Sequence, residues 1–354
     1  MKKNTLIIIG LAIVLAVTAF FLTRNNNRST VREELRDFAI ADTSSVTKIF
    51  LASRTGTHST LVKNADGSWT VNGKFKARPD AINNLLVTMQ KLEIYSPVAT
   101  SGEANVIKSL ATKATKVEIY QNNDHKKPSK VYYVGGPTQN QLGTYMLIEN
   151  SSKPFIMHIP GFKGYLSPRY FTSENEWRSR EIFSFDRDEI ASVELKNFIV
   201  PERSYTILNK SEAGEEHKFQ LLNSDGESVS PTDTLKIATY LTFFEKIHFE
   251  GFDTAIKKEV KDSIIDAGPN FILTITGKNG DPKSIVMYNM PLSKRSSVQT
   301  DREGNPLTID RDRFYGVIEG EENFVVLQYY VFEKILRALD EFRYRQKTQA
   351  RQPV

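Results

Sequence analysis

Histidine, cysteine and clustered carboxylates are the residues from which most metal sites and general acid–base sites are built. The chain has no cysteine, and its five histidines are spread along it as His58, His125, His158, His217 and His248. No two of them are separated by a helical or strand spacing, and no carboxylate stands where it would complete a ligand set. A zinc site would need ligands from distant segments to converge. We therefore expect neither a metal nor any other cofactor.

The sequence also lacks the motifs that create a strong nucleophile or a phosphate-binding loop. It has no G-x-S-x-G elbow, no S-x-x-K followed by its companion motifs, and no G-x-x-x-x-G-K loop. The densest carboxylates are Asp301, Glu303, Asp310 and Asp312, which alternate with arginines and lack the regular offsets of a calcium loop. We interpret this group as a solvated loop. We predict no catalytic residue, and hence a protein that is not an enzyme.

The amino-terminal segment carries the clearest structural signal. An apolar run extends from Thr5 to Leu22 and includes Gly10 and Phe20. As a helix it would be about 27 Å long, close to the thickness of a bilayer core. A cleaved signal peptide needs small residues at its cleavage site, whereas this run ends in bulky side chains. We expect an uncleaved membrane span within residues 1–24 and a linker over 25–44. The lack of cysteine excludes a lipoprotein anchor.

The charges around this segment predict its orientation. Lys2 and Lys3 precede the apolar run, which favours a cytoplasmic amino terminus, and the arginines that follow it weaken this bias. The expected location is the inner membrane, with a single span and with the main body in the periplasm. The net charge is +5, but acidic residues are scattered among the basic ones, so we expect no nucleic-acid partner.

The body of the chain contains the same pattern twice. The first apolar stripe has the spacing of an amphipathic helix, and each position recurs 155 residues later. The first stripe is Ile82, Leu85, Leu86, Met89 and Leu92, and the second is Ile237, Tyr240, Leu241, Phe244 and Ile247. In each copy three strands precede this helix. A short second helix, 104–110 or 259–265, and four strands follow it.

This order predicts an α+β fold and not a parallel α/β sheet. We expect an N-terminal transmembrane helix followed by two tandem, structurally similar, mainly antiparallel sheet-plus-helix domains. The first repeat is expected over 45–160 and the second over 190–330. Apolar residues at helical spacing predict a C-terminal helix that docks on the body, followed by a basic tail, over 331–354.

The segment between the repeats, 161–189, is rich in aromatic and basic residues. Its candidate functional side chains are Tyr165, Arg169, Tyr170, Trp177, Arg178 and Arg180. Arginine side chains that stack on aromatic rings commonly stabilise structure, which favours an interdomain hinge. A surface that binds a partner is the alternative.

These features resemble a bacterial envelope family known as domain of unknown function 4340. The resemblance rests on the anchor, on Trp69-Thr70-Val71, on the helix from Asp80 to Leu92, on Val131-Tyr132-Tyr133-Val134-Gly135 and on Trp177-Arg178-Ser179-Arg180. It covers residues 45–200 best. It implies an anchored envelope protein, in some cases associated with transporters linked to gliding, and it implies no catalytic residue.

Three tripeptides are similar to the acceptor pattern for periplasmic O-glycosylation in the Bacteroidota. They make Thr234, Thr254 and Ser263 candidate glycosylation sites.

Taken together, these features predict a membrane-anchored protein that binds or scaffolds other envelope proteins. Two alternatives remain open at this point. One is a ligand-sensing domain, and the other is an enzyme acting on envelope polymers with its site between the two repeats.

Overall fold

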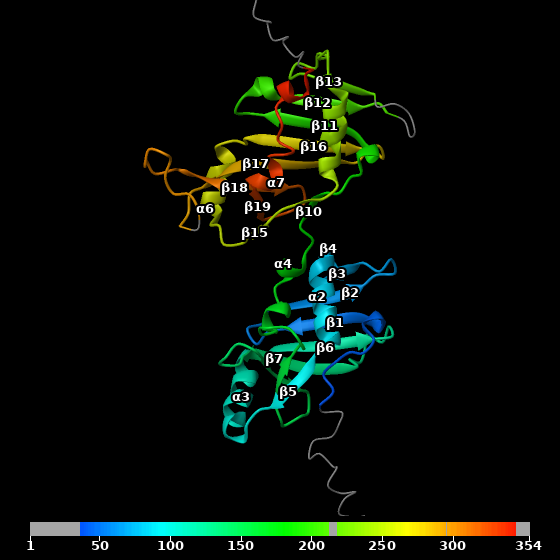
Figure 1. Cartoon of the computed structure of the whole chain (residues 1–354), viewed down its shortest axis with the longest axis vertical. Helices are drawn as coiled ribbons and strands as arrows, with labels where there is room; N and C mark the ends of the chain where they lie inside the picture. The colour runs from blue at the N-terminus through cyan, green and yellow to red at the C-terminus, as the bar shows by residue number, and fades with distance from the viewer. Residues whose placement is uncertain (1–35, 212–217, 295, 345–354) are drawn as a thin grey trace, which may run out of the picture. The chain divides into compact units, whose positions relative to one another are not determined.

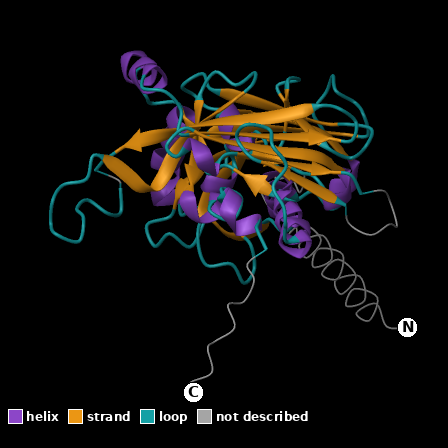
Figure 2. Cartoon of the chain, turned by 90° about the horizontal axis from the view of Figure 1, so that it is seen from above, coloured by secondary structure: helices purple, strands orange, loops and turns teal. Residues whose placement is uncertain are grey.

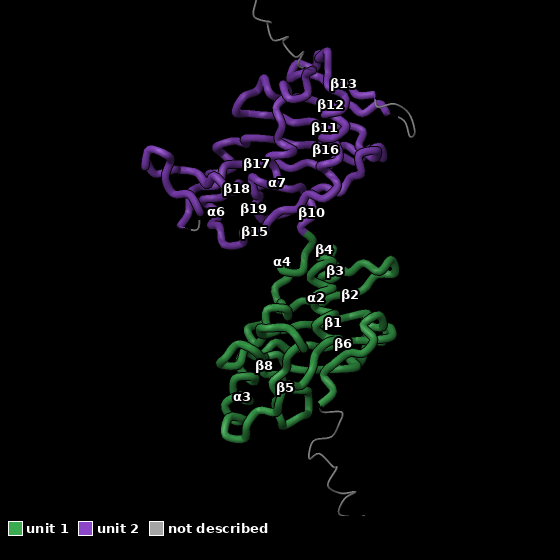
Figure 3. Tube along the Cα trace, in the orientation of Figure 1, with its two compact units in different colours: residues 1–179 green, residues 180–354 purple. Residues whose placement is uncertain are grey.

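The computed structural model describes residues 36–211, 218–294 and 296–344. The chain divides into two compact units, Met1–Ser179 and Arg180–Val354 (Figure 3). The predicted span, with Thr5, Gly10, Phe20 and Leu22, lies outside the described residues, as do most of the predicted linker and the basic tail from 345 onward. Within the described part of the chain, no helix is long and apolar enough to cross a membrane.

The first unit is built on a nine-stranded antiparallel sheet with the order β4-β3-β2-β1-β6-β7-β8-β9-β5 (Figure 1). Its strands are β1 (Val46–Ala52), β2 (His58–Lys63), β3 (Trp69–Val71), β4 (Phe75–Lys76), β5 (Glu93–Pro97), β6 (Thr115–Gln121), β7 (Lys130–Pro137), β8 (Thr144–Ile148) and β9 (Phe155–His158). Its main helices are α2 (Pro79–Gln90) and α3 (Thr100–Lys113).

Local sequence explains these elements. From Ile49 onward strand β1 buries alternate residues, Ile49 and Leu51, which is the period expected of a strand with one face on the core. Between β2 and β3 the chain turns at Gly67, whose φ of +84° suits a residue without a Cβ. Helix α2 begins with Pro79, which needs no hydrogen-bond partner at a helix start, and it buries Ile82, Leu85 and Met89 against the sheet.

The second unit is built on an eight-stranded antiparallel sheet with the order β13-β12-β11-β16-β17-β18-β19-β15. Its strands are β11 (Ile190–Asn197), β12 (Tyr205–Asn209), β13 (Phe219–Leu222), β15 (Gly251–Asp253), β16 (Phe271–Gly277), β17 (Pro282–Pro291), β18 (Ile309–Ile318) and β19 (Phe324–Gln328). Strands β10 (Glu181–Phe183) and β14 (Ile247–His248) form a separate pair. Helices α5 (Thr234–Leu241) and α6 (Lys258–Asp266) precede β16.

The fold is therefore α+β with two large antiparallel sheets, as the sequence predicts, and strands make up most of its regular structure (Figure 2). The two strand orders correspond: β13-β12-β11-β16-β17-β18-β19-β15 has the same sequence of connections as β3-β2-β1-β6-β7-β8-β9-β5. Helix α5 occupies the place of α2 in this order, and α6 that of α3. The predicted apolar stripes pack in the two cores, with Leu86 only partly buried. They extend beyond the helices, because Leu92 follows α2, Phe244 lies in a 3₁₀ turn after α5 and Ile247 lies in β14.

Several boundaries differ from those expected. The sequence gives no signal for the edge strands β5 and β15, because each is short and carries few buried side chains. Helix α3 begins four residues before the predicted 104, since its first turn, from Thr100 to Glu103, is polar and shows no apolar periodicity. Phe38 and Ile40, placed in the predicted linker, are buried in the first core, and the Ile40 amide donates to the Met89 carbonyl at 3.0 Å.

The predicted C-terminal helix is also interrupted. The chain forms α7 (Tyr329–Phe332) and then a separate 3₁₀ turn, η7 (Leu339–Phe342), preceded by Ala338 in an extended conformation. The Glu341 carboxylate accepts a hydrogen bond from the Ala338 amide at 3.0 Å, which caps the new turn. This break lets Phe332, Ile335, Leu339 and Phe342 all enter the second core. The path of the C-terminal segment therefore follows from the burial of these side chains and not from the helical periodicity of its sequence.

Candidate functional site

The residues with the greatest chemical potential do not gather at one place. His58, His125, His158 and His248 lie on β2, on the β6–β7 turn, on β9 and on β14, and His217 lies outside the described residues. Among the described residues, no group of three or more His, Cys, Asp or Glu side chains could hold a metal ion. His125 is exposed in this turn.

The carboxylate group near residue 301 is only partly a solvated loop. Asp301 stays at the surface, whereas Asp310 is 3% exposed. The Asp310 carboxylate accepts hydrogen bonds from the Ser296 hydroxyl at 2.6 Å and from the amides of Asp312 and Arg313 at 2.8 and 2.9 Å. These donors satisfy the buried charge. Asp310 therefore fixes the conformation of the long β17–β18 loop. The alternation of acidic residues and arginines in the sequence does not reveal this role.

The aromatic and basic segment belongs largely to the first unit. Tyr170 and Trp177 are buried in its core, and Tyr165 is half-buried. The Trp177 indole nitrogen donates to the Phe171 carbonyl at 3.0 Å, and the Tyr170 hydroxyl lies 3.4 Å from that of Tyr132. The rings are therefore structural and leave no surface at these two positions for a partner.

The arginines of this segment hold its parts together. The Arg178 guanidinium lies 3.6 Å from the centre of the Phe75 ring, and its Nη1 donates to the Asn175 side chain at 3.1 Å. Arg169 lies over the Phe162 ring at 4.4 Å and donates to the Thr88 hydroxyl at 2.9 Å. Arg180, the first residue of the second unit, donates to the Glu250 carbonyl at 2.5 Å. Stacking of arginine on rings is the arrangement that the sequence favours here.

The three candidate glycosylation hydroxyls lie at exposed positions. Thr234 is the first residue of α5, Thr254 follows β15 and Ser263 lies on α6. The Asp253 carboxylate accepts hydrogen bonds from the amides of Ala255 and Ile256, both at 3.1 Å, so it shapes the turn that carries Thr254. Whether any of these residues is modified stays a prediction.

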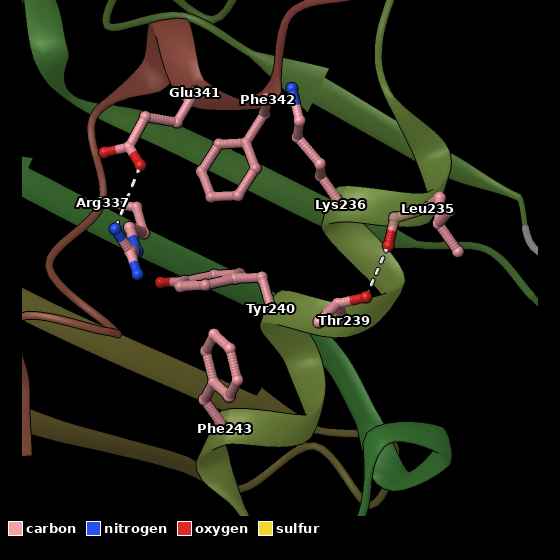
Figure 4. A pocket seen from close by; sticks show the side chains of 8 residues that line it. All are labelled: Leu235, Lys236, Thr239, Tyr240, Phe243, Arg337, Glu341 and Phe342. Atoms are coloured by element: carbon pink, nitrogen blue, oxygen red, sulfur yellow. Dashed lines mark hydrogen bonds and ion pairs between the residues drawn. The ribbon is translucent and has the colours of Figure 1, made fainter.

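The second unit contains a pocket of about 640 Å³ between α5 and η7 (Figure 4). Three rings form its inner wall: Tyr240 lies between Phe342, at 4.9 Å between ring centres, and Phe243, at 6.5 Å. At its outer end Leu235 is 76% exposed. The pocket is therefore an apolar groove that opens beside an exposed leucine.

The polar groups of this groove bond to one another. Arg337 pairs with Glu341 at 3.2 Å, Lys236 pairs with Asp233 at 3.3 Å, and the Thr239 hydroxyl donates to the Leu235 carbonyl at 2.9 Å. Burial raises the pKa of Tyr240 far above the usual value for tyrosine, so its hydroxyl stays protonated at neutral pH. Its proton is donated to the Ile335 carbonyl at 2.8 Å.

The hydroxyl groups of the groove are engaged in hydrogen bonds within the protein. The hydroxyls that face the groove are already donors to carbonyl groups, and neither is held by a base that could activate it. Sequence reasoning missed the groove because its two walls are about a hundred residues apart. The only local signal was the exposed Leu235, which stands outside the apolar stripe of α5.

The fold is a two-unit α+β protein, and its second unit carries an apolar groove. A family model described as domain of unknown function (DUF4340) matches residues 69–267, more than half of the chain. The chain belongs to this family, as the resemblance indicates. The match runs from the first residue of β3 to the residue after α6, so it includes parts of both units. Comparisons with curated proteins and with solved structures found no match.

Proposed function

We propose that this chain is a non-catalytic, membrane-anchored protein of the bacterial envelope that binds and braces other envelope proteins, such as the components of a transporter, secretion or gliding machine. The observation that carries the proposal is the groove between α5 and η7. Its central ring, Tyr240, is fixed by a hydrogen bond to the Ile335 carbonyl, its Arg337 and Glu341 side chains form an ion pair, and its open end presents Leu235. Preformed apolar grooves with few polar groups favour binding.

The proposal includes a membrane anchor, a periplasmic location for the body and an internal duplication. The apolar run from Thr5 to Leu22 supports a single inner-membrane span, and Lys2 and Lys3 support a cytoplasmic amino terminus. The body would then lie in the periplasm. The shared strand order and the shared helix stripe support two tandem domains that arose by duplication. Two such units would give one anchored chain two separate binding faces.

The lack of cysteine makes the topology directly testable. A single cysteine introduced as Ser152→Cys, at an exposed position before β9, should react in intact cells with a maleimide that crosses the outer membrane but not the inner one. The matched variant Lys3→Cys should react only after the inner membrane is opened. Protection of Ser152→Cys in intact cells would place the body in the cytoplasm and would contradict the proposal.

Binding is tested by a photo-reactive benzophenone amino acid at Leu235 in the full chain, in its native membrane. We expect a covalent adduct of defined mass that contains another envelope protein. Val87, an exposed apolar position on α2, is the matched control and should give no such adduct. Recovery of the chain alone from both variants would argue against a bracing function.

A further inference from the structure

The first unit contains a pocket of its own, of about 450 Å³. It lies on the face of the sheet that points away from the core. It lies where β8, β9 and β5 are neighbours, beside the β7–β8 turn. Ile156 and His158 alternate along β9 with Phe155 and Met157, which are buried in the core, so the first two side chains face away from it. This volume lies within the range of ligand pockets.

A β-bulge brings the most exposed aromatic ring of the described part of the first unit to this pocket. In the pairing of β5 with β9, Ile94 is opposite Met157 and Ser96 is opposite Ile156, so Tyr95 is an extra residue between them. Bulges change the direction of a side chain and are common beside functional sites. Tyr95 is 69% exposed, and its ring contacts His158 edge to face at 5.3 Å. A large ring held at the surface in this way is available for stacking.

Two further rings complete the apolar wall. Tyr145 on β8 is paired directly with Ile156 on β9. Phe162 follows β9 and is held by the Arg169 guanidinium, which lies 4.4 Å from the centre of its ring. Arg169 is itself fixed by its hydrogen bond to Thr88. The aromatic and basic segment therefore positions one wall of the pocket.

The rim offers hydrogen-bonding groups that the fold leaves open. The Asn140 side-chain oxygen accepts from the Thr138 hydroxyl at 2.7 Å and from the Leu142 amide at 3.1 Å, which fixes the turn. Within the described residues, nothing accepts a hydrogen bond from the Asn140 amide nitrogen, and the Tyr95 and Tyr145 hydroxyls have no partner. Gln139 and Lys163 also line the pocket.

We propose that this pocket binds an oligosaccharide, with a pyranose ring stacked on Tyr95 and its hydroxyls bonded to the amides of Asn140 and Gln139. A sugar ring presents weakly positive C–H groups on its faces and hydroxyls at its edge, and the negative face of an aromatic ring attracts the former. An acyl chain would leave the rim groups unpaired. A phosphate would meet one lysine, because the lining residues include no other ammonium or guanidinium group.

Calorimetric titration of the purified full chain tests this inference, in a detergent without a sugar head group. The probes are cellotetraose, chitotetraose, maltotetraose and mannotetraose. We expect at least one to bind with a Kd of about 1 mM or lower. Tyr95→Ala should raise that Kd about tenfold. Tyr330→Ala removes a similarly exposed ring on α7 and should leave the Kd unchanged.

A second variant separates binding from folding. Asn140→Asp keeps the oxygen that the turn requires and removes the free amide donor, so it should raise the Kd about fivefold while the unfolding midpoint stays the same. Failure of all four probes to bind would overturn the inference, as would equal affinities of wild type and Tyr95→Ala. This outcome is independent of crosslinking at Leu235, so either proposal can fail alone.

Discussion

The hydroxyl groups of Tyr205 and Tyr240 lie 2.7 Å apart inside the second core, where strand β12 meets helix α5. Tyr240 donates its single proton to the Ile335 carbonyl at 2.8 Å, so Tyr205 must be the donor in the pair. This chain of bonds connects the sheet, the helix and the C-terminal segment through buried polar groups. Such groups are costly when any one of them loses its partner.

The two tyrosines should therefore differ in their effect on stability. Tyr240→Phe leaves both the Tyr205 hydroxyl and the Ile335 carbonyl unpaired, and we expect it to lower the free energy of unfolding by about 2–3 kcal/mol. Tyr205→Phe removes only a donor to Tyr240 and should cost about 1 kcal/mol. Urea unfolding followed by circular dichroism measures both. Equal costs would contradict the assigned direction of donation.

Stability should fall at alkaline pH. Burial raises the pKa of Tyr170 to about 12 and raises the pKa of Tyr132 well above the ordinary value of 10. Above pH 10 the unfolded chain loses phenolic protons that the folded chain keeps, so the free energy of unfolding decreases as pH rises. This contribution is fully present below pH 10. Phenolate absorbance and circular dichroism are recorded together, and the last step of the rise in absorbance, from the buried tyrosines, should coincide with the loss of the circular dichroism signal. Ionisation of all tyrosines without loss of structure would refute this account.

Adjacent glycines on β7 should respond differently to alanine. A Cβ at Gly135 would lie 2.6 Å from the Leu110 side chain of α3 and 3.0 Å from the Tyr145 carbonyl oxygen, whereas a Cβ at Gly136 meets nothing within 4 Å. We expect Gly135→Ala to cost about 1–3 kcal/mol because α3 must shift away from the sheet. Gly136→Ala is the matched control and should be near neutral. Thermal unfolding of both variants measures the difference.

Arg178 should not be replaceable by lysine. Its guanidinium stacks on Phe75 at 3.6 Å and also bonds to Asn175, and an ammonium group cannot reproduce this planar contact. We expect Arg178→Lys to lower the free energy of unfolding by about 1–2 kcal/mol. Arg203→Lys, at an exposed position, provides the control. The same midpoint in both variants would show that the stacking contributes nothing to stability.

Deletion of the Trp177 ring should have a larger effect. The side chain is fully buried, and its indole nitrogen satisfies the Phe171 carbonyl. Trp177→Ala would leave a cavity and an unpaired acceptor, and we expect a loss of about 3–5 kcal/mol. Urea unfolding of the full chain checks this value. A loss below about 1 kcal/mol would instead fit a surface role for this residue.

The sequence predicts the architecture better than the sites. Helices α2 and α5 are recognisable because their apolar stripes are local sequence patterns. The same stripe occurs in both units, and in both units it packs against the core. Edge strands β5 and β15 could not be predicted from the sequence. Each is extended because it forms hydrogen bonds with a strand that is distant in sequence, β9 or β19. For the same reason the C-terminal segment follows the second core and not its helical periodicity.

The two pockets show this limit most clearly. Tyr95 is an unremarkable tyrosine in the sequence, and only the shift in register between β5 and β9 presents its ring beside His158. Likewise, Tyr240 belongs to a core stripe by its spacing, yet it also lines the groove, because Arg337 and Phe342 reach it from the other end of the unit. Neither site has a sequence motif.

By itself the sequence determined the family, the α+β class and the paired helices, since periodicity and composition act between residues that are close along the chain. Tertiary structure alone decided which polar groups are satisfied, which aromatic rings are buried and which remain open to a ligand. These properties depend on contacts between residues that are far apart in the sequence. Such contacts produce no regular spacing in the sequence from which they could be predicted.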